Sequence, residues 1–332
     1  MKLKTEITLT PEANQIDYTS KILLLGSCFS EYIGAKFDWF KFQNLQNPFG
    51  VIFNPISIEK LIDRAIDEVS FSEEDIFLHN GLWKCFEVHS ELSALDKNEF
   101  LENLNVSLYN LREALFAATH IILTFGTSWV YRYLGASSSV HPELIRGLGA
   151  PKIVANCHKL PQQYFKKELL SIETILKSLE RIFDTISIIN PKATIITTVS
   201  PVRHLKDGFV ENSLGKAHLI AAIHQSLSLR ACQSRNCYFP AFEIMMDELR
   251  DYRFYAEDML HPNKTAIEMI WQKFSQVWIA SETEALQMEI ASIQHGLNHK
   301  PFNPESTAHL QFEKTLQQKI SALQNRFPQI KF

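Results

Sequence analysis

Four short apolar runs, each ending in small or polar residues, set the strongest limit on how this chain can fold. The runs are KILLLGS at 21–27, HIILTFGTS at 120–128, ATIITTVSP at 193–201 and NCYFPAFEIM at 236–245. They do not alternate with polar residues, which is the pattern of strands buried on both faces of a parallel sheet. Helical patterns separate them, at 97–118, 164–189 and 211–231. This alternation of strand and helix predicts a doubly wound α/β sheet.

Two insertions interrupt the alternation. Residues 75–92 predict a β-hairpin that turns at Asn80 and Gly81, a pair that favours tight hairpin turns. Residues 130–161 are rich in loop-forming residues and have short strand-like pieces at their ends. We expect both insertions to lie over the edge of the sheet and to wall an active site.

The last part of the chain has a different pattern. Two amphipathic helical segments follow residue 280 and are separated by NHKPFNPES at 298–306. We therefore expect residues 1–280 to form the α/β domain. Residues 281–332 are expected to form a helical extension that packs against this domain or mediates a homodimer.

Composition excludes several classes of partner and location. The chain has 332 residues, of which 45% are hydrophobic, and a net charge of −4. Because no long basic run occurs, nucleic acid is not an expected partner. No apolar stretch reaches the roughly 18 residues of a membrane span, and the first residues lack the apolar core of a secretory signal. We expect a cytoplasmic protein with no membrane partner.

Five cysteines, at 28, 85, 157, 232 and 237, are scattered along the chain. Their odd number and a reducing compartment argue against a disulfide framework. Cys157-His158 and Cys85 with His89 are too sparse for a zinc site, so no metal is expected. The sequence also has no GxGxxG or Walker-type loop, and we expect no nucleotide cofactor.

Polar clusters stand at the ends of three of the expected strands. They occupy residues 26–28, 126–128 and 200–204. Because ligands bind outside the carboxyl ends of strands in open α/β sheets, these clusters should converge on one pocket. Near the end of the expected α/β domain, Asp258 and His261 are three residues apart, a spacing that lets a carboxylate and an imidazole share one face of a helical turn.

These clusters resemble the sequence blocks of the SGNH/GDSL hydrolase superfamily. The last block, an aspartate and a histidine ahead of a proline, stands intact as DMLHP at 258–262. In the first block Gly26 matches, but Ser27 replaces the aspartate and Cys28 replaces the nucleophilic serine. The text GSCFS at 26–30 is close to GSCFA, which names a bacterial family of SGNH-like proteins. Further blocks similar to that family are NPFG at 47–50, NCHKLP at 156–161 and SPVRH at 200–204.

The resemblance covers roughly residues 20 to 300 and implies a flavodoxin-like, three-layer α/β/α sandwich of the SGNH hydrolase type. It also implies a nucleophile at Cys28, with His261 as general base and Asp258 as the carboxylate that orients it. A thiol at a strand-to-helix turn lies near the first helical N–H groups, which lower the thiol pKa and favour the thiolate. We therefore expect Cys28 to lie within hydrogen-bond reach of His261. Cys28 should also alkylate faster than the other four cysteines.

Two alternatives remain open at this turn. Cys28 is a packing residue in the simplest interpretation of a free cysteine, and Ser27 is a rival nucleophile. The oxyanion of an acyl intermediate needs donors, for which the Cys28 N–H and Gly50 of the second block are candidates. The asparagine of the third block is absent, so Ser128 or Asn156 would take its place. Other candidates for substrate binding are His89, His158, Arg203 and His204.

The favoured function is acyl transfer or ester hydrolysis on a small acylated or carbohydrate substrate. Arg203 with its neighbouring histidines suits a substrate that carries phosphate, carboxylate or many hydroxyls. A non-catalytic binding module that retains an SGNH pocket is the main alternative, and a Cys28 sulfur far from the His261 ring would favour it. A redox thiol sensor is a third interpretation. The acyl group, the acceptor and the choice between hydrolase and transferase stay open.

Overall fold

A computed structural model describes residues 5–135, 152–230 and 236–332. Its centre is a five-stranded sheet in which every neighbouring pair is parallel. In spatial order the strands are β10 (Asn236–Tyr238), β9 (Thr194–Val199), β5 (His120–Phe125), β1 (Lys21–Gly26) and β2 (Gln43–Gln46). Numbered along the chain, this order is 2-1-3-4-5, which is the flavodoxin-like arrangement. The predicted fold class is confirmed.

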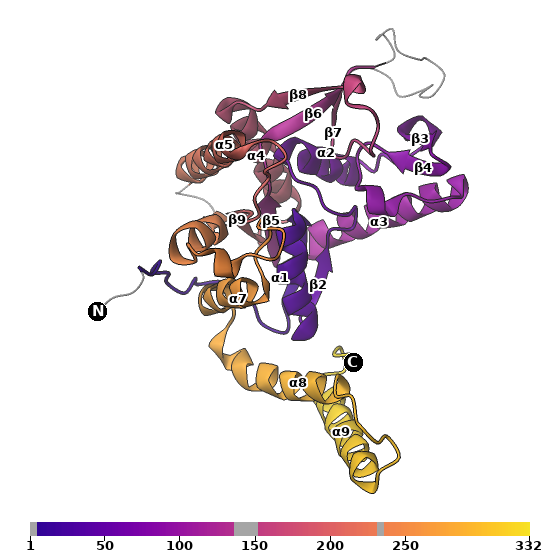
Figure 1. Ribbon diagram of the computed structural model, residues 1–332, viewed down its shortest axis with the longest axis vertical. Coiled ribbons are helices and arrows are strands. Elements are labelled where there is room, and N and C mark those ends of the chain that lie inside the picture. Colours follow the sequence, from indigo (N-terminus) through magenta and orange to yellow (C-terminus); the bar gives the residue numbers. More distant parts are fainter. Residues whose placement is uncertain (1–4, 136–151, 231–235) are drawn as a thin grey trace.

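Helices cover both faces of the sheet (Figure 1). One layer consists of α2 (Pro55–Ile66), α3 (Lys97–Ala117), α4 (Ile172–Ile189) and α5 (Phe209–Leu229). The other layer contains α1 (Cys28–Trp39), the short α6 (Ala241–Glu243) and α7 (Lys264–Trp278). Residues of β1 divide between the two cores, because Leu23 and Leu25 pack on the first layer while Ile22 and Leu24 pack on the second. The continuous apolar run of β1 thus follows from burial on both faces.

Two predicted elements differ from those in the structure. The run at 236–245 forms a strand of only three residues and then turns into helix, since Pro240 has no N–H to donate to a sheet ladder. The helix expected at 164–189 begins only at Ile172. The segment before it is β8 (Phe165–Leu169), which pairs antiparallel with β6 (Trp129–Tyr133).

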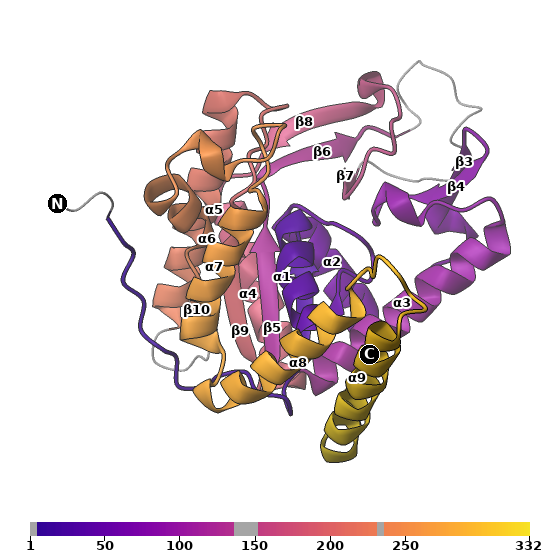
Figure 2. The ribbon, with the colours of Figure 1, turned by 60° about the horizontal axis from the view of Figure 1, so that its bottom comes forward.

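Both insertions form small antiparallel sheets. β3 (Ile76–His79) and β4 (Leu82–Cys85) make the predicted hairpin, with Asn80 and Gly81 at φ values of 51° and 74° as a two-residue turn with positive φ requires. β6 pairs on its other side with β7 (Lys152–Val154). Residues 136–151 of the second insertion lie outside the described residues. In Figures 1 and 2, β6, β7 and β8 lie over the end of the sheet where α1 begins.

The last two helices, α8 (Glu284–Leu297) and α9 (Thr307–Arg326), lie at the opposite end of the molecule (Figure 2). The side chain of Gln294 on α8 donates a hydrogen bond to the Trp39 carbonyl at the end of α1. The tail is therefore remote from the carboxyl edge of the sheet. Within the described residues, no helix is both long and apolar enough to cross a membrane.

Candidate active site

The turn between β1 and α1 presents one of its two candidate nucleophiles to solvent-accessible space. Ser27 is completely buried, and its Oγ caps α1 by accepting a hydrogen bond from the Phe29 N–H at 3.3 Å. Cys28 is half-buried and lines a cavity. Gly26 makes this turn possible, because at φ = 140° a Cβ there would lie 2.1 Å from the Thr124 carbonyl oxygen. Ser27 therefore has a capping role, and Cys28 is the side chain that can meet a substrate.

The cavity lies at the carboxyl edge of the sheet and has a volume of about 770 Å³. Its walls come from α1, from the segment after the hairpin, from the β6–β8 sheet and from the loop after β9. Six of the residues singled out from the sequence line it, namely Cys28, His89, Asn156, Arg203, His204 and His261. The strand ends thus converge as expected, and both insertions contribute to the wall.

Asp258 and His261 form a hydrogen-bonded pair, of which His261 lines this cavity. Asp258 Oδ2 is 2.6 Å from His261 Nδ1, and Oδ1 accepts from the backbone N–H groups of His261 and Leu260. These hydrogen bonds lower the Asp258 pKa to about 2. Because the carboxylate holds Nδ1–H, the other ring nitrogen, Nε2, is the one left to exchange protons. Among the described residues no hydrogen bond to Nε2 is formed.

Cys28 and His261 line the same cavity, but within the described part of the chain no hydrogen bond joins them. Burial raises the Cys28 pKa to about 11, and the nearby Glu31 carboxylate adds to the rise. The expectation of a lowered pKa is therefore wrong, because burial outweighs the backbone N–H groups at the start of α1. The raised pKa of the Cys28 thiol does not favour the redox sensor, which requires a low-pKa thiolate.

Lys216 is the residue that sequence reasoning missed. It lies on α5, is 2% exposed, and donates from Nζ to the Ser200 carbonyl oxygen at 2.6 Å. Burial lowers its pKa to about 7, and Cys28 acts in the opposite direction. The sequence held one indication of this burial. Leu219 and Ile223 are buried core residues three and seven positions further on, so Lys216 shares their face of the helix.

His204 approaches the strand ends from the loop after β9. Its Nε2 is buried without a hydrogen-bond partner in the described structure, and a Cβ on Gly126 would lie 3.1 Å from that nitrogen. Burial lowers the His204 pKa to about 3, and the nearby Lys216 and His261 add to this effect. The ring is therefore neutral near pH 7, and it carries one N–H.

Three residues expected at the site serve other roles. The Ser128 hydroxyl is fully buried and donates to the Gly215 carbonyl at 2.9 Å, while the Gly50 N–H donates to Asn47. Neither residue lines the cavity. His158 is 1% exposed and its Nε2 lies 2.6 Å from the Cys85 carbonyl oxygen, so it supports the wall from behind.

The wall near Cys28 carries acidic groups. Burial raises the pKa of the Glu31 carboxyl, and the charge of Glu91 raises it further. His89 Nδ1 lies 3.4 Å from Glu91 Oε1, and the His89 N–H donates to the Phe49 carbonyl. On another part of the wall the Arg203 guanidinium stacks on the Tyr255 ring at 4.3 Å. The cavity thus offers both a cation and carboxylates to a polar substrate.

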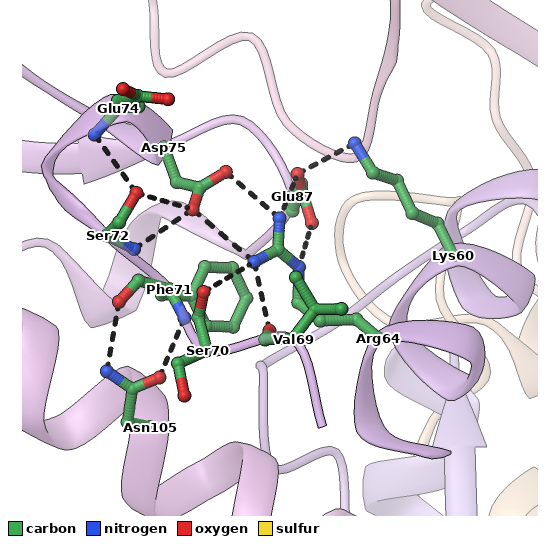
Figure 3. Close-up of polar contacts among 10 residues, drawn as sticks. All are labelled: Lys60, Arg64, Val69, Ser70, Phe71, Ser72, Glu74, Asp75, Glu87 and Asn105. Atoms are coloured by element: carbon green, nitrogen blue, oxygen red, sulfur yellow. Dashed lines mark hydrogen bonds and ion pairs between the residues drawn. The ribbon is translucent and has the colours of Figure 1, made fainter. Parts of the chain in front are cut away.

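A cluster of polar contacts holds the hairpin in place (Figure 3). Arg64 on α2 pairs with Asp75 at 2.9 Å and with Glu87 at 3.0 Å, and Lys60 pairs with Glu87 at 2.7 Å. The Arg64 guanidinium also lies 4.2 Å above the Phe71 ring. Because Glu87 is only two residues before His89, this cluster fixes the wall segment of the cavity to α2.

Two of the other cysteines could compete with Cys28 in labelling experiments, namely the half-buried Cys157 and the buried Cys85. Cys157 lines the same cavity, and burial raises its pKa to about 12. Cys85 is completely buried and has a pKa raised to about 12. Cys232 lies outside the described residues. The structure shows no cluster of three or more His, Cys, Asp or Glu side chains that could hold a metal ion in the ranges that it describes.

Comparison with known proteins gives two family matches. The model of the GSCFA family matches residues 21–274, and that of the GSCFA domain protein C-terminal domain matches residues 290–332. No curated protein sequence matches the chain. The first match contains every residue of the cavity discussed above, and the second begins within α8.

Two solved structures are similar to the chain at low identity. A candidate platelet activating factor from Streptococcus pneumonia is 12% identical, with 76% of this chain and 82% of that chain covered and a TM-score of 0.36. A carbohydrate esterase family 3 protein from Talaromyces cellulolyticus is 6% identical, with 81% and 99% covered and a TM-score of 0.36.

Proposed function

The chain belongs to the GSCFA family, and from this premise we propose that it transfers or hydrolyses the acyl group of a small acylated or carbohydrate substrate. One observation carries the proposal. The Cys28 thiol and the His261 imidazole, itself held by Asp258, line a single cavity at the carboxyl edge of the sheet. A nucleophile, a base and an orienting carboxylate in one cavity are the components of covalent acyl transfer.

The first half of the reaction forms a thioester. His261 Nε2 takes the proton from Cys28, and the thiolate attacks the acyl carbon of the substrate. The tetrahedral intermediate collapses with cleavage of the ester bond, and the leaving oxygen receives the proton from His261. The two side chains have to approach each other when the substrate binds, as catalytic hydrogen bonds commonly tighten only in the substrate complex. In the second half, water or an acceptor hydroxyl gives its proton to His261 and attacks the thioester. The second tetrahedral intermediate collapses with cleavage of the C–S bond, and the Cys28 sulfur takes the proton back from His261.

The oxyanion requires donors other than Ser128 and Gly50. We assign this role to the Cys28 N–H and to the neutral ring of His204, which lines the cavity and whose buried, unpartnered Nε2 has to turn toward the oxyanion when the substrate binds. Each such donor contributes about 3 kcal/mol to stabilisation of the intermediate. His204→Leu should therefore lower the rate of acylation about a hundredfold, and a rate within threefold of the wild type would remove His204 from this role.

The cavity suits a polar ligand of limited size. Its volume of about 770 Å³ lies in the range typical of small-molecule sites. Trp129 and Tyr131 line one side, which offers aromatic surface to a sugar ring, while Asn156 and Arg203 offer hydrogen-bond donors. These features favour an acylated carbohydrate over a long apolar acyl chain.

The test is to incubate the protein with p-nitrophenyl acetate and to follow both intact mass and ester turnover. We expect one acetyl group on Cys28, loss of turnover in Cys28→Ala, and a loss of a hundredfold or more in His261→Ala. Cys157→Ala is the matched control, because Cys157 lines the same cavity. Acetylation of Cys157 alone, or no acylation at all, would contradict the proposal.

The raised pKa of Cys28 and the lack of a bond to His261 favour a second candidate, a non-catalytic binding module. In that case a carbohydrate should bind with equal affinity to the wild type and to Cys28→Ala, with no turnover by either. Isothermal titration with a series of acylated and unacylated sugars distinguishes the two functions.

A further inference from the structure

Arg203, in the loop after β9, is a half-buried cation of the cavity wall. Its guanidinium carbon lies 4.3 Å from the centre of the Tyr255 ring and 5.4 Å from that of the Tyr252 ring. Among the described residues it forms no ion pair with a carboxylate. Stacking occupies the faces of a guanidinium, whereas its N–H donors lie in its plane, where a ligand with two oxygens can meet them.

The acidic residues that lie near Arg203 or its two tyrosines in sequence are paired with other cations. The pairs are Asp207 with Lys167 at 2.6 Å, Asp258 with His261 at 2.6 Å and Asp251 with Arg253 at 3.0 Å. These carboxylates are therefore already engaged. A half-buried cation has given up part of its hydration, and charge-assisted hydrogen bonds to an anionic ligand would replace it.

Backbone hydrogen bonds tie Arg203 to the proposed base. The Arg203 N–H donates to the Leu260 carbonyl, directly before His261, at 3.2 Å. The Ala256 N–H, directly after Tyr255, donates to the His261 carbonyl at 2.7 Å. One segment of the chain thus carries both the aromatic support of Arg203 and the base. An anion bound to Arg203 and an acyl group next to His261 can therefore belong to one small ligand.

The charges of the cavity come from different walls. Lys206, from the same loop as Arg203, and Lys159, from the segment after β7, line the cavity, are exposed, and form no ion pair within the described ranges. The acidic side chains Glu31 and Glu91 come from α1 and from the segment after the hairpin, where Glu91 is 3.4 Å from His89. A ligand with one anionic end is therefore attracted to one wall and disfavoured at the other.

We propose that Arg203 is the anion-binding residue of the cavity and that the substrate carries a phosphate, besides its acyl group. The guanidinium binds two oxygens of the anion while the tyrosine rings hold its plane in position. Lys206 and Lys159 add positive charge to the same cavity, which suits a phosphate dianion. The identity of the substrate rests on the proposed function, whereas the anion site itself needs no chemistry at Cys28. A carboxylate has the same fork-shaped contacts, and the experiment distinguishes the two anions.

Isothermal titration of the whole protein with glucose 6-phosphate, glucuronate and glucose tests the site. Glucose 6-phosphate should bind at least about tenfold more tightly than glucose, because hydrogen bonds to charged groups are the stronger ones. A preference for glucuronate over both would support the site and identify its anion as a carboxylate. Equal affinity for all three ligands would overturn the proposal.

Arg203→Gln should remove the preference for the anion, and Arg203→Lys should keep only part of it, because a point charge replaces the planar fork. Arg253→Gln is the matched control. Arg253 belongs to the segment that carries the two tyrosines, but it pairs with Asp251 and does not line the cavity. A preference that survives in Arg203→Gln, or that is lost equally in Arg253→Gln, would contradict the assignment.

A measurement on the wild type alone covers the case in which Arg203→Gln does not fold. The affinity for glucose 6-phosphate should fall as sodium chloride is added, while that for glucose stays constant, and binding that ignores salt would overturn the proposal. If glucose 6-phosphate binds through Arg203 but p-nitrophenyl acetate never acylates Cys28, the proposed function fails and this inference stands. If Cys28 is acylated but the anion brings no gain in affinity, the proposed function stands and the anion site fails.

Discussion

Two cations, the largely buried Arg64 and the fully buried Lys216, have opposite surroundings. Arg64 contacts two carboxylates and the carbonyls of Val69 and Ser70, so its charge is fully compensated (Figure 3). Lys216 contacts one carbonyl and one aromatic ring, and no ion pair with a carboxylate is formed within the described residues.

This difference in surroundings shifts the pKa values of the two side chains in opposite directions, which gives Arg64 a structural role and lets Lys216 titrate. Burial lowers the Arg64 pKa, but Glu87 and Asp75 outweigh it and raise the pKa overall, so this guanidinium stays charged at every accessible pH. Burial lowers the Lys216 pKa to about 7, so its charge changes in the range where enzymes work. The paired charges of Arg64, Asp75 and Glu87 fix the cavity wall, whereas the buried Lys216 can gain or lose its proton near neutral pH.

The largest expected effect comes from removing the paired cation. Arg64→Met leaves the buried Glu87 and the half-buried Asp75 without their main partner, which should lower the free energy of unfolding by about 3–5 kcal/mol. Urea unfolding measures this. Arg112→Met removes a half-exposed partner of Glu68 and should cost less than about 1 kcal/mol. Equal losses in the two variants would show that the cluster of Figure 3 does not hold the hairpin.

Lys216 should make the free energy of unfolding depend on pH. The Lys216 pKa is about 7 in the folded protein, against the ordinary lysine value of 10.5 in the unfolded chain, so between these values the unfolded chain binds one more proton. Stability contributed by this residue therefore rises with pH, by about 1.4 kcal/mol per pH unit. Lys216→Met should lack that slope between pH 7 and 9, a window below the raised thiol pKa of Cys28.

Urea unfolding of the two proteins at pH 7, 8 and 9 tests this slope. The difference between wild type and Lys216→Met should grow in favour of the wild type as pH rises. Parallel curves would mean that Lys216 keeps its proton throughout, and that its charge is compensated after all.

The sequence predicted those parts of the fold that depend on neighbouring residues. β1, β5 and β9 are apolar because each is covered on both faces, and their patterns are unambiguous. β2, with the sequence QNLQ, was missed because an edge strand pairs with β1 on one side only and carries polar side chains. A polar edge strand has no periodic signal that distinguishes it from a loop.

In the candidate site, too, contacts between residues close in sequence could be predicted, and contacts between distant segments could not. Asp258 and His261 are close in sequence, so their spacing predicted a contact that the structure contains. The pKa of Cys28 could not be predicted, because it depends on the depth of burial and on Lys216, which is far along the chain. Sequence also cannot tell that the Ser128 hydroxyl is already used by the Gly215 carbonyl. Contacts between distant segments decide which polar residues remain free for chemistry.

The smallest expected effect distinguishes the two neighbours at the start of α1. Ser27→Ala removes the helix cap and should lower the free energy of unfolding by about 1 kcal/mol, with the rate of Cys28 alkylation unchanged within twofold. Ser171→Ala, which removes the cap of α4, provides the control for a cap far from the cavity. Urea unfolding therefore tests the capping role of Ser27, and acylation tests the nucleophile at Cys28. If Ser27→Ala abolished acylation by p-nitrophenyl acetate while Cys28→Ala retained it, the roles of the two residues would be reversed. The cavity would then have to open to a side chain that is now completely buried.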